Sequence, residues 1–402
     1  MLHLHFGAGR LGLGLVVPAF QSQQSETFVL NRSVSGSNDT GATSLTPTRR
    51  NDLLGSEERS YLIQKPGGTG WQRVTYDGFT TYDAGTILGL VEQVILSSNA
   101  AARGIVLTAS VLKPENYGAV VQALNVAATL KEQRAAIGPI FLVACENTVS
   151  AQEVIDSPMW SDALSAQARN QVVCADALVD RLCVGMDEVE YEGRPYVRVC
   201  AEGYASLKLA LRPATEPLVE LCRGSMVEFS RHLEVEKQIK GWLLNGSHWL
   251  IALQAFQASN GDRKINLNEY IASEPAMRRF ASEVMEEMRE GVALHLKSNP
   301  EYSAFLEDVD VESYLQGAAT RILERFDSTD DPITRILARF QAPSREAVAS
   351  IEAFSKRFSD RIKEPMMAYE AEKGSVPPAV SRGLFSLFQL VASGTFIDAH
   401  AS

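Results

Sequence analysis

A glycine-rich turn directly behind the first apolar segment constrains the fold more than any other feature of the sequence. Leu2–Phe6 has the length of a buried strand, and the next six residues read G-A-G-R-L-G, which fits the pattern G-x-G-x-x-G. In that pattern the glycines let the chain turn tightly, let a pyrophosphate approach the backbone and let the following helix pack on the sheet. A second apolar strand, Thr27–Leu30, follows at the spacing that the motif requires. The residues of this turn that we expect to bind a dinucleotide are Gly7, Gly9, Arg10, Leu11 and Gly12.

Apolar runs of strand length recur along the first half of the chain. They are Ile105–Ala109, Ile140–Ala144, Tyr196–Cys200 and Ala205–Leu211. A helical stretch, Tyr117–Arg134, separates the first two, and such continuous strands between helices predict a parallel sheet that is covered on both faces. The last two read as an antiparallel extension of that sheet. We add Thr108 to the expected cofactor contacts, and we expect Pro18 to kink or shorten the first helix.

The pattern changes to helical periodicity from about Pro213 onward. The expected helices are Leu218–Ser230, Leu233–Ala258, Pro275–Leu296, Val311–Arg325, Pro332–Phe340, Arg345–Arg361 and Val380–Val391. Ser33–Thr46 is the clearest loop, and Asp327–Asp331 is a second break. The sequence therefore predicts an α/β N-terminal Rossmann domain over residues 1–211, with a doubly wound and mostly parallel sheet. It also predicts a predominantly α-helical substrate and catalytic domain over residues 212–402.

Composition narrows the class of protein. With 402 residues and 45% apolar side chains, the chain is long enough for two domains with buried cores. A net charge of -11 argues against a nucleic-acid partner. The first strand begins at Leu2, which leaves no room for a signal peptide, and no apolar run reaches the roughly 18 residues of a membrane span. The absence of C-x-x-C spacing among the cysteines argues against disulfides and a metal site and favours the cytoplasm. The cysteines are Cys145, Cys174, Cys183, Cys200 and Cys222.

The residue at the end of the second strand bears on the choice between NAD and NADP. A carboxylate at this position binds the ribose 2′-hydroxyl of NAD, whereas an arginine accepts the 2′-phosphate of NADP. Here the strand ends in Asn31, Arg32 and Ser33, without a carboxylate. Asn31 can bond a hydroxyl, but the guanidinium of Arg32 suits a phosphate, so that NADP is favoured over NAD.

Three polar residues, Lys240, Asn245 and His248, stand out in a largely apolar helical segment, Lys240–Ile251. At about 100° per residue, Lys240, His248 and Asn245 fall at roughly 0°, 80° and 140°, on one side of the helix. Polar groups on a buried helix need partners or a purpose, and Gly241 and Gly246 allow a close approach. The three groups suit alcohol oxidation by hydride transfer, with Lys240 as the general base and with Asn245 and His248 donating hydrogen bonds to the reacting oxygen. No metal is required.

The pattern Lys240-x4-Asn245-x2-His248 resembles the active-site signature of the polyol-specific long-chain dehydrogenase/reductase family, the mannitol dehydrogenase family. The opening of the sequence, L-H-L-H-F-G-A-G, resembles the opening of the family branch that acts on mannitol 1-phosphate. Ala144-Cys145-Glu146-Asn147 is similar to a family segment, and the resemblance implies that Asn147 lies beside the reacting centre. It further implies substrate contacts in a V-D-R segment and in a late D-R-x-x-K-P-like segment, namely Asp180, Arg181, Arg361 and Lys363. Asn31 departs from the family, which usually has aspartate there, and Lys363 lies one position early.

The resemblance implies a small polyol or its ketose as substrate. A sugar phosphate needs a cationic pocket, for which Arg361 and Lys363 are candidates, so that mannitol 1-phosphate and fructose 6-phosphate are favoured. A mannitol 2-dehydrogenase or hexuronate reductase acting on a non-phosphorylated ketose is an alternative. Asn31-Arg32-Ser33 is also similar to a strand ending in 6-phosphogluconate dehydrogenases, although their serine-glycine-glycine segment is missing. A non-catalytic NADP-sensing protein is the alternative from another class, and a monomer and a homodimer are both open.

Overall fold

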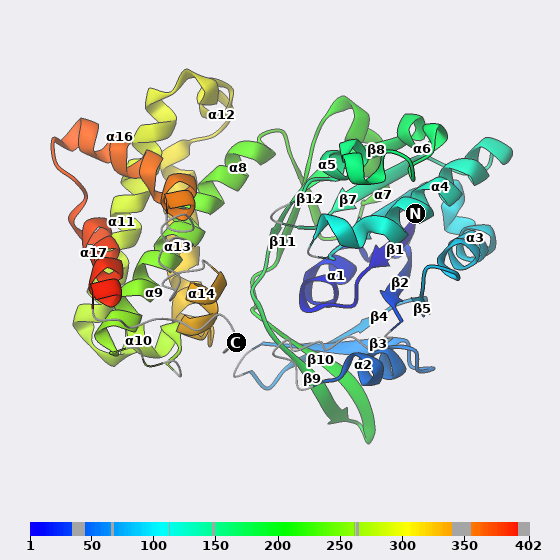
Figure 1. Ribbon diagram of the computed structural model, residues 1–402, viewed down its shortest axis with the longest axis horizontal. Coiled ribbons are helices and arrows are strands. Elements are labelled where there is room, and N and C mark those ends of the chain that lie inside the picture. Colours follow the sequence, from blue (N-terminus) through cyan, green and yellow to red (C-terminus); the bar gives the residue numbers. More distant parts are fainter. Residues whose placement is uncertain are drawn as a thin grey trace. The chain divides into compact units, whose positions relative to one another are not determined.

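The computed structural model describes residues 1–33, 45–65, 68–111, 113–146, 149–260, 262, 265–339 and 355–392. The chain divides into two compact units, unit 1 over Met1–Leu233 and unit 2 over Glu234–Ser402 (Figure 1). This division follows Leu233 rather than Leu211 because strand β12 (Val227–Ser230) pairs with β11 (Ser206–Ala210) and belongs to the first sheet. The helix expected over Leu218–Ser230 is therefore wrong in its second half, since only α7 (Glu216–Leu221) is helical.

Eight described strands form the main sheet of unit 1, in the order β12-β11-β8-β7-β6-β1-β2-β5. All neighbouring pairs in it are parallel except β11 with β8. Besides β11 and β12, the strands are β1 (Leu2–Phe6), β2 (Glu26–Arg32), β5 (Gly78–Tyr82), β6 (Ile105–Ala109), β7 (Ile140–Ala144) and β8 (Val172–Asp180). Every residue of β1, β6 and β7 is buried, as the continuous apolar runs predict for strands covered on both faces.

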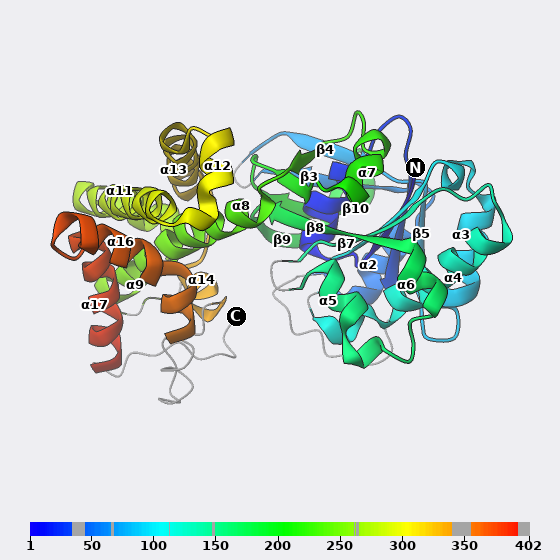
Figure 2. The same ribbon diagram turned by 90° about the horizontal axis from the view of Figure 1, so that it is seen from above.

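Helices cover both faces of this sheet. One face packs on α3 (Ile87–Ser97), α4 (Gly118–Gln133), α5 (Ala151–Asp156) and α6 (Ala166–Gln171), and α3 and α4 lie side by side in both views (Figure 1 and Figure 2). The other face packs on α7 and on a short irregular helix, a π turn (Gly12–Val16) followed by α1 (Val17–Phe20). Pro18 lies in the first turn of α1, and the helix ends at Phe20, so that it is short as expected. Short 3₁₀ turns lie at Asn99–Ala102, Pro114–Tyr117, Pro158–Trp160 and Pro213–Thr215.

A second, four-stranded sheet of order β4-β3-β10-β9 completes unit 1. Its strands are β3 (Ser60–Gln64), β4 (Trp71–Thr75), β9 (Cys183–Tyr191) and β10 (Arg194–Ala201), and helix α2 (Pro47–Leu54) adjoins it. The expected strand Tyr196–Cys200 lies in this sheet and does not extend the first one, because β10 pairs with β3 and β9. Apolar side chains of the sheet pack on Leu13 and Val17, directly behind the glycine-rich turn.

The secondary structure of unit 2 is helical in its described residues, with loops between the helices and an isolated bridge between Asn266 and Pro332. Its elements are α8 (Leu233–Lys240), a π turn (Gly241–Gly246), α9 (Ser247–Ala258), α10 (Leu267–Ser273), α11 (Pro275–Ser298), a 3₁₀ turn (Pro300–Tyr302), α12 (Ser303–Asp308), α13 (Val311–Ser328), α14 (Ile333–Arg339), a second π turn (Ser359–Lys363), α16 (Glu364–Lys373) and α17 (Pro378–Ala392). They surround one apolar core in which Trp249 and Phe256 of α9 are completely buried. The predicted class, a Rossmann domain followed by a predominantly α-helical domain, is confirmed.

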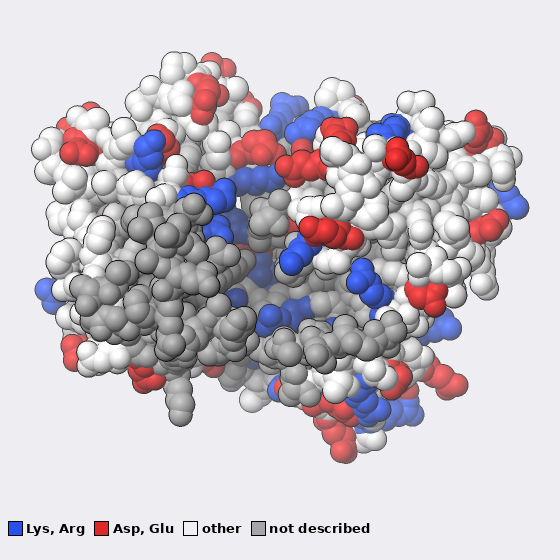
Figure 3. Space-filling view, viewed as in Figure 1, with Lys and Arg blue, Asp and Glu red and all other residues white. Residues whose placement is uncertain are grey.

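The surface of each unit mixes both signs of charge. In Figure 3, acidic and basic side chains are interspersed over the visible face of each unit. Among the described residues, no helix combines the length and the apolar character that a bilayer crossing requires.

Candidate functional site

The glycine-rich turn follows β1 and is shaped by contacts that exclude larger side chains. Gly7 has φ of +108°, and a Cβ there would lie 2.8 Å from the Ser110 carbonyl oxygen. A Cβ on Gly12 would meet the His5 ring and lie 2.5 Å from the Gly7 carbonyl oxygen, whereas a Cβ on Gly9 would meet no described atom within 4 Å. Gly7 and Gly12 are therefore required by the fold of the turn itself, whereas Gly9 leaves space on its outer side.

Asn31 ties this turn to the end of β2. Its Oδ1 accepts a hydrogen bond from the Ala8 N–H at 3.1 Å, and its Nδ2 donates to Asn51 Oδ1 on α2 at 2.7 Å. Asn31 is buried, whereas its neighbour Arg32 is exposed and donates to Asn116 Oδ1 at 3.4 Å. The asparagine therefore braces the turn from within, and Arg32 is the side chain at this strand end that reaches solvent.

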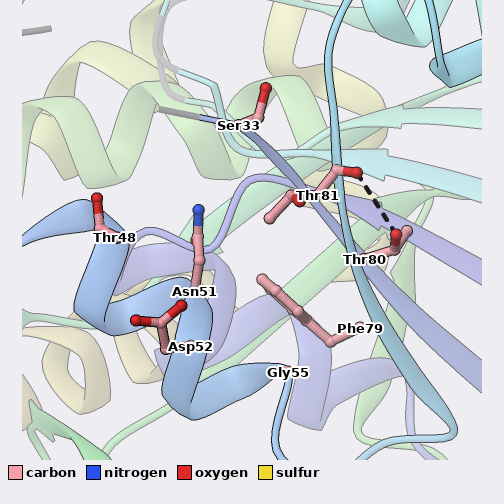
Figure 4. A pocket seen from close by; sticks show the side chains of 8 residues that line it. All are labelled: Ser33, Thr48, Asn51, Asp52, Gly55, Phe79, Thr80 and Thr81. Carbon is pink, nitrogen blue, oxygen red and sulfur yellow. Dashed lines mark hydrogen bonds between the residues drawn. The ribbon is translucent and has the colours of Figure 1, made fainter. Parts of the chain in front are cut away.

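A cavity of about 570 Å³ lies beside the end of β2. Figure 4 shows Asn51 and Asp52 of α2 on one side of it and Thr80 and Thr81 of β5 on another. Its lining also includes Ser33, Thr48, Gly55 and Phe79. This volume is in the range of small-molecule sites, and hydroxyl, amide and carboxylate groups around an aromatic ring suit a nucleoside. Sequence reasoning missed Asp52, because it reaches the end of β2 from α2, beyond the loop that follows the strand.

A buried polar network lies under the turn. The Thr108 hydroxyl lies 2.8 Å from His3 Nε2 and 2.7 Å from His5 Nδ1, and Ser110 Oγ lies 3.2 Å from His5 Nε2. Burial lowers the pKa of His5 to about 4, although its hydrogen bond to the Gly7 backbone raises it. Burial, followed by the charge of His5, lowers the pKa of His3 well below its usual value. Both histidines are therefore neutral at pH 7, and Thr108 faces them from a completely buried position.

Two predicted arginines bind backbone carbonyl groups of unit 1. Arg10 Nη1 donates to the Val184 carbonyl at 3.1 Å. Arg181 donates through Nε to the Glu202 carbonyl at 3.0 Å and through Nη1 to the Gly14 carbonyl, and burial lowers its pKa. Asp180, the last residue of β8, is half-buried and pairs with Ser206 of β11. Arg10 and Arg181 thus join the helix behind the glycine-rich turn to the β8–β10 region.

The Lys240–His248 segment is one helix interrupted by a π turn. Lys240 ends α8, Asn245 lies in the π turn, and His248 is in the first turn of α9. Hydrogen bonds in a π turn join residues five apart, so that residues i and i+5 lie one turn apart on one face. The 100° step that we assumed therefore does not hold over this turn. The π geometry aligns Lys240 with Asn245. His248 follows Asn245 by three residues in the α-helical part, so the two are neighbours on the helix surface.

The second π turn, which carries Arg361 and Lys363, packs on the first. A Cβ on Gly246 would lie 2.8 Å from the Arg361 carbonyl oxygen and 3.1 Å from Ile362 Cδ1. Arg361 and Lys363 are half-buried, and Lys363 Nζ lies 3.7 Å from the Glu364 carboxylate. Unit 2 thus brings the lysine–asparagine–histidine segment next to the late cationic segment. Gly246 makes the close approach that we expected of it, whereas a Cβ on Gly241 would meet no described atom within 4 Å.

The His248 ring contacts the buried carboxylate of Asp331. Its Nε2 is 3.4 Å from Asp331 Oδ2, and its ring stacks on Phe326 at 4.8 Å between centroids. Asp331 was missed because it lies in the break before α14, far along the sequence from His248. Asn147 lies outside the described residues. Among the described residues, no group of three or more His, Cys, Asp or Glu side chains is placed to hold a metal ion.

No family model matches the sequence, and no curated protein matches it. Its fold is shared with solved dehydrogenases. A D-sorbitol dehydrogenase in substrate-free form is 12% identical with a TM-score of 0.66, over 97% of this chain and 80% of that one. The mannitol 2-dehydrogenase of Pseudomonas fluorescens, in a ternary complex with NAD and D-mannitol, is also 12% identical, with a TM-score of 0.55, over 98% of this chain and 92% of that one. The chain therefore has the fold of these polyol dehydrogenases.

Proposed function

We propose that the protein is an NAD(P)-dependent oxidoreductase that interconverts a secondary alcohol of a polyol and the corresponding ketose. The observation that carries this proposal is the π turn that puts Lys240 and Asn245 on one face of a buried helix, in a fold shared with two polyol dehydrogenases. Unit 1 supplies the dinucleotide turn and the nucleoside-sized cavity, and unit 2 supplies the acid–base side chains. We therefore propose unit 1 as the cofactor domain and unit 2 as the substrate and catalytic domain, with the boundary at Leu233 in place of Leu211.

The bound nicotinamide supplies hydride chemistry, and the side chains handle the proton and the charge on the oxygen. In alcohol oxidation, Lys240 Nζ takes the hydroxyl proton while the carbinol carbon loses hydride, and in ketone reduction Lys240 returns that proton. Asn245, together with Asn147, donates hydrogen bonds to the oxygen as negative charge develops on it. His248 completes the substrate contacts. Thr108 lies in the buried network under the glycine-rich turn. The proposed cofactor-binding residues of that turn are Gly7, Gly9, Arg10, Leu11 and Gly12.

Arg32 and Asp52 favour different cofactors, and we propose NADP. Arg32 is exposed, directly precedes Ser33 of the cavity lining and offers two parallel donors to a 2′-phosphate. Asp52 lines the cavity, where its carboxylate would accept from a ribose 2′-hydroxyl and repel a phosphate. Arg32→Ala and Asp52→Asn form a matched pair for this question. We expect Arg32→Ala to raise KM for NADPH more than for NADH, and Asp52→Asn to raise KM for NADH more than for NADPH. Preference for NADH in the unchanged protein would make Asp52 the deciding residue.

The substrate that we propose is mannitol 1-phosphate with fructose 6-phosphate, the pair used by mannitol-1-phosphate 5-dehydrogenase. Support comes from Arg361 and Lys363, which lie on the segment that packs against Gly246. Both are half-buried and can pair with a phosphate dianion. Asp180 and Arg181 remain proposed substrate contacts, although the Arg181 side chain binds the Gly14 and Glu202 carbonyls. A free ketose, as used by mannitol 2-dehydrogenase or hexuronate reductases, is the alternative substrate.

The test is NADPH oxidation by the purified protein with fructose 6-phosphate, with NADH, fructose and fructuronate as comparisons. Turnover with the phosphorylated ketose supports the whole proposal, and turnover with a free ketose alone keeps the reaction and removes the phosphate. Lys240→Ala should abolish turnover and keep cofactor binding. Lys237→Ala is the matched control, because Lys237 lies on the same helix and pairs with Glu234 at 3.0 Å. Cofactor binding without turnover on any of these substrates would favour the NADP-sensing alternative.

A further inference from the structure

Unit 2 contains a carboxylate that the proposed reaction does not use. Asp331 lies between α13 and α14, and only 3% of its side chain is exposed. Its backbone is held in place, because its carbonyl accepts a hydrogen bond from the Leu267 N–H at 2.9 Å and the next residue, Pro332, bridges to Asn266. A buried carboxylate on a fixed backbone is costly unless it is paired, so its partners indicate what it does.

Two basic side chains meet this carboxylate from different elements. Arg335, in α14, donates through Nε to Oδ1 at 2.6 Å and through Nη2 to Oδ2 at 2.5 Å. His248, in α9, brings Nε2 to 3.4 Å from Oδ2. Burial raises the pKa of Asp331, but the hydrogen bond and charge of His248 and those of Arg335 outweigh it, so that this pKa lies below its usual value. The carboxylate is therefore ionised and can accept a hydrogen bond from a protonated ring nitrogen.

This arrangement restricts the orientation of the His248 ring and favours one of its tautomers. Phe326 stacks on one face of the ring with an interplanar angle of 22°, which restricts its rotation. A carboxylate accepts hydrogen bonds and cannot donate them, so that a hydrogen bond across the 3.4 Å contact from Nε2 to Asp331 requires the proton on Nε2. In the neutral ring, Nδ1 then has a lone pair and accepts hydrogen bonds.

We propose that Asp331, anchored by Arg335, is the positioning residue that holds His248 with Nε2–H on the carboxylate, so that Nδ1 accepts a hydrogen bond from a hydroxyl of the polyol. This inference rests on the proposed function for the identity of the hydroxyl ligand. It changes the role of His248, because a neutral ring held this way binds a hydroxyl group as an acceptor. Donation to the developing oxyanion is then left to the other side chains, Asn245 among them.

The tautomer can be measured in the protein without any substrate. We would label the histidines with ¹⁵N, record long-range ¹⁵N–¹H spectra at pH 8 and assign His248 by the signals lost in His248→Gln. We expect protonated Nε2 and unprotonated Nδ1 in the unchanged protein. A proton on Nδ1 with Nε2 unprotonated would overturn the proposal, whether or not the protein turns over a polyol. This arm therefore fails independently of the proposed function.

A second arm uses kinetics and a matched pair of neighbouring carboxylates. Asp331→Asn should lower kcat/KM for the polyol by about tenfold or more and change the His248 signals. Asp330→Asn is the control, because Asp330 is exposed and accepts from Asn268 Nδ2 at 2.7 Å, and it should change neither. Asp331→Asn and His248→Gln combined should cost little more than His248→Gln alone, since they act through one contact. Additive losses, or unchanged His248 signals in Asp331→Asn, would overturn the proposal. If Asp331→Asn does not fold, the spectrum of the unchanged protein still decides.

Discussion

Two glycines of the glycine-rich turn, Gly9 and Gly12, should have different effects when each is replaced by alanine. A Cβ on Gly12 would lie 2.5 Å from the Gly7 carbonyl oxygen and 2.6 Å from Ser110 Oγ, besides meeting the His5 ring. Backbone must move to relieve the first of these contacts. Overpacking of this kind costs about 1–3 kcal/mol, which lowers Tm by about 2–12 °C in a unit of this size.

Gly9→Ala should leave stability unchanged and weaken cofactor binding. A Cβ on Gly9 would meet no described atom within 4 Å, so that nothing in the turn has to move. It would, however, occupy the space through which a pyrophosphate approaches the backbone. Loss of one hydrogen bond to a charged group costs about 1.5–3 kcal/mol, which is roughly 10- to 150-fold in Kd.

The assays are urea unfolding of the cofactor-free protein and titration of NADPH by its fluorescence. The reasoning requires Gly12→Ala to shift the unfolding midpoint and Gly9→Ala to shift the Kd at an unchanged midpoint. A Gly12→Ala protein as stable as the unchanged one would refute the packing account. A Gly9→Ala protein that binds NADPH with unchanged Kd would refute the assignment of this turn to the pyrophosphate.

Three further predictions concern stability. Arg181→Lys should lower the free energy of unfolding by about 1–3 kcal/mol, because one ammonium cannot replace the contacts to both carbonyls, and an effect on substrate KM alone would contradict this. The pKa of His5 is about 4 in the folded protein, below its unfolded value, so the contribution of neutral His5 to stability is present above pH 6.5 and is lost as the pH falls toward 4. Urea unfolding should show a loss of roughly 3 kcal/mol over this range, and His5→Gln should flatten the pH dependence. Gly246→Ala should destabilise the protein by about 1–3 kcal/mol, since its Cβ would lie 2.8 Å from the Arg361 carbonyl oxygen. Gly241→Ala should not, because its Cβ would meet no described atom within 4 Å. Equal midpoints for the two variants in thermal unfolding would contradict the packing described.

The sequence predicted the elements whose burial is uniform. The strands Leu2–Phe6, Ile105–Ala109 and Ile140–Ala144 have the predicted bounds, because residues buried on both faces form continuous apolar runs. The second sheet was not predicted as a sheet. Strands such as β4 (Trp71–Thr75) and β9 (Cys183–Tyr191) mix buried and exposed residues. Each pairs with the strand next to it along the chain, but the sheet is completed by β3 pairing with β10, which lies far away in the sequence. Local periodicity carries no information about such pairing.

The candidate site divides in the same way. Spacing alone pointed to Lys240, Asn245 and His248, but the π turn that aligns the first two changes the helical step that we assumed. Asp331 could not be predicted, because its relation to His248 exists only after α9 and α13 pack in one core. Asn31 was predicted as a cofactor contact that can bond a hydroxyl, but its contacts to the Ala8 N–H and Asn51 could not be predicted, because they depend on α2 returning to the end of β2.

The supports of the glycine-rich turn have a consequence for how the chain is made. The Leu13 carbonyl accepts from the Tyr61 hydroxyl of β3, and the Gly14 and Val184 carbonyls are joined to Arg181 and Arg10. Arg181 and β9 follow the turn at a distance of more than half the length of unit 1, so they are synthesised well after it. At about 5–20 residues per second, a nascent chain carries an unsupported turn for on the order of ten seconds. During that interval the turn lacks the contacts that Arg181 and Val184 provide, and its fold is complete only after β9 has been made.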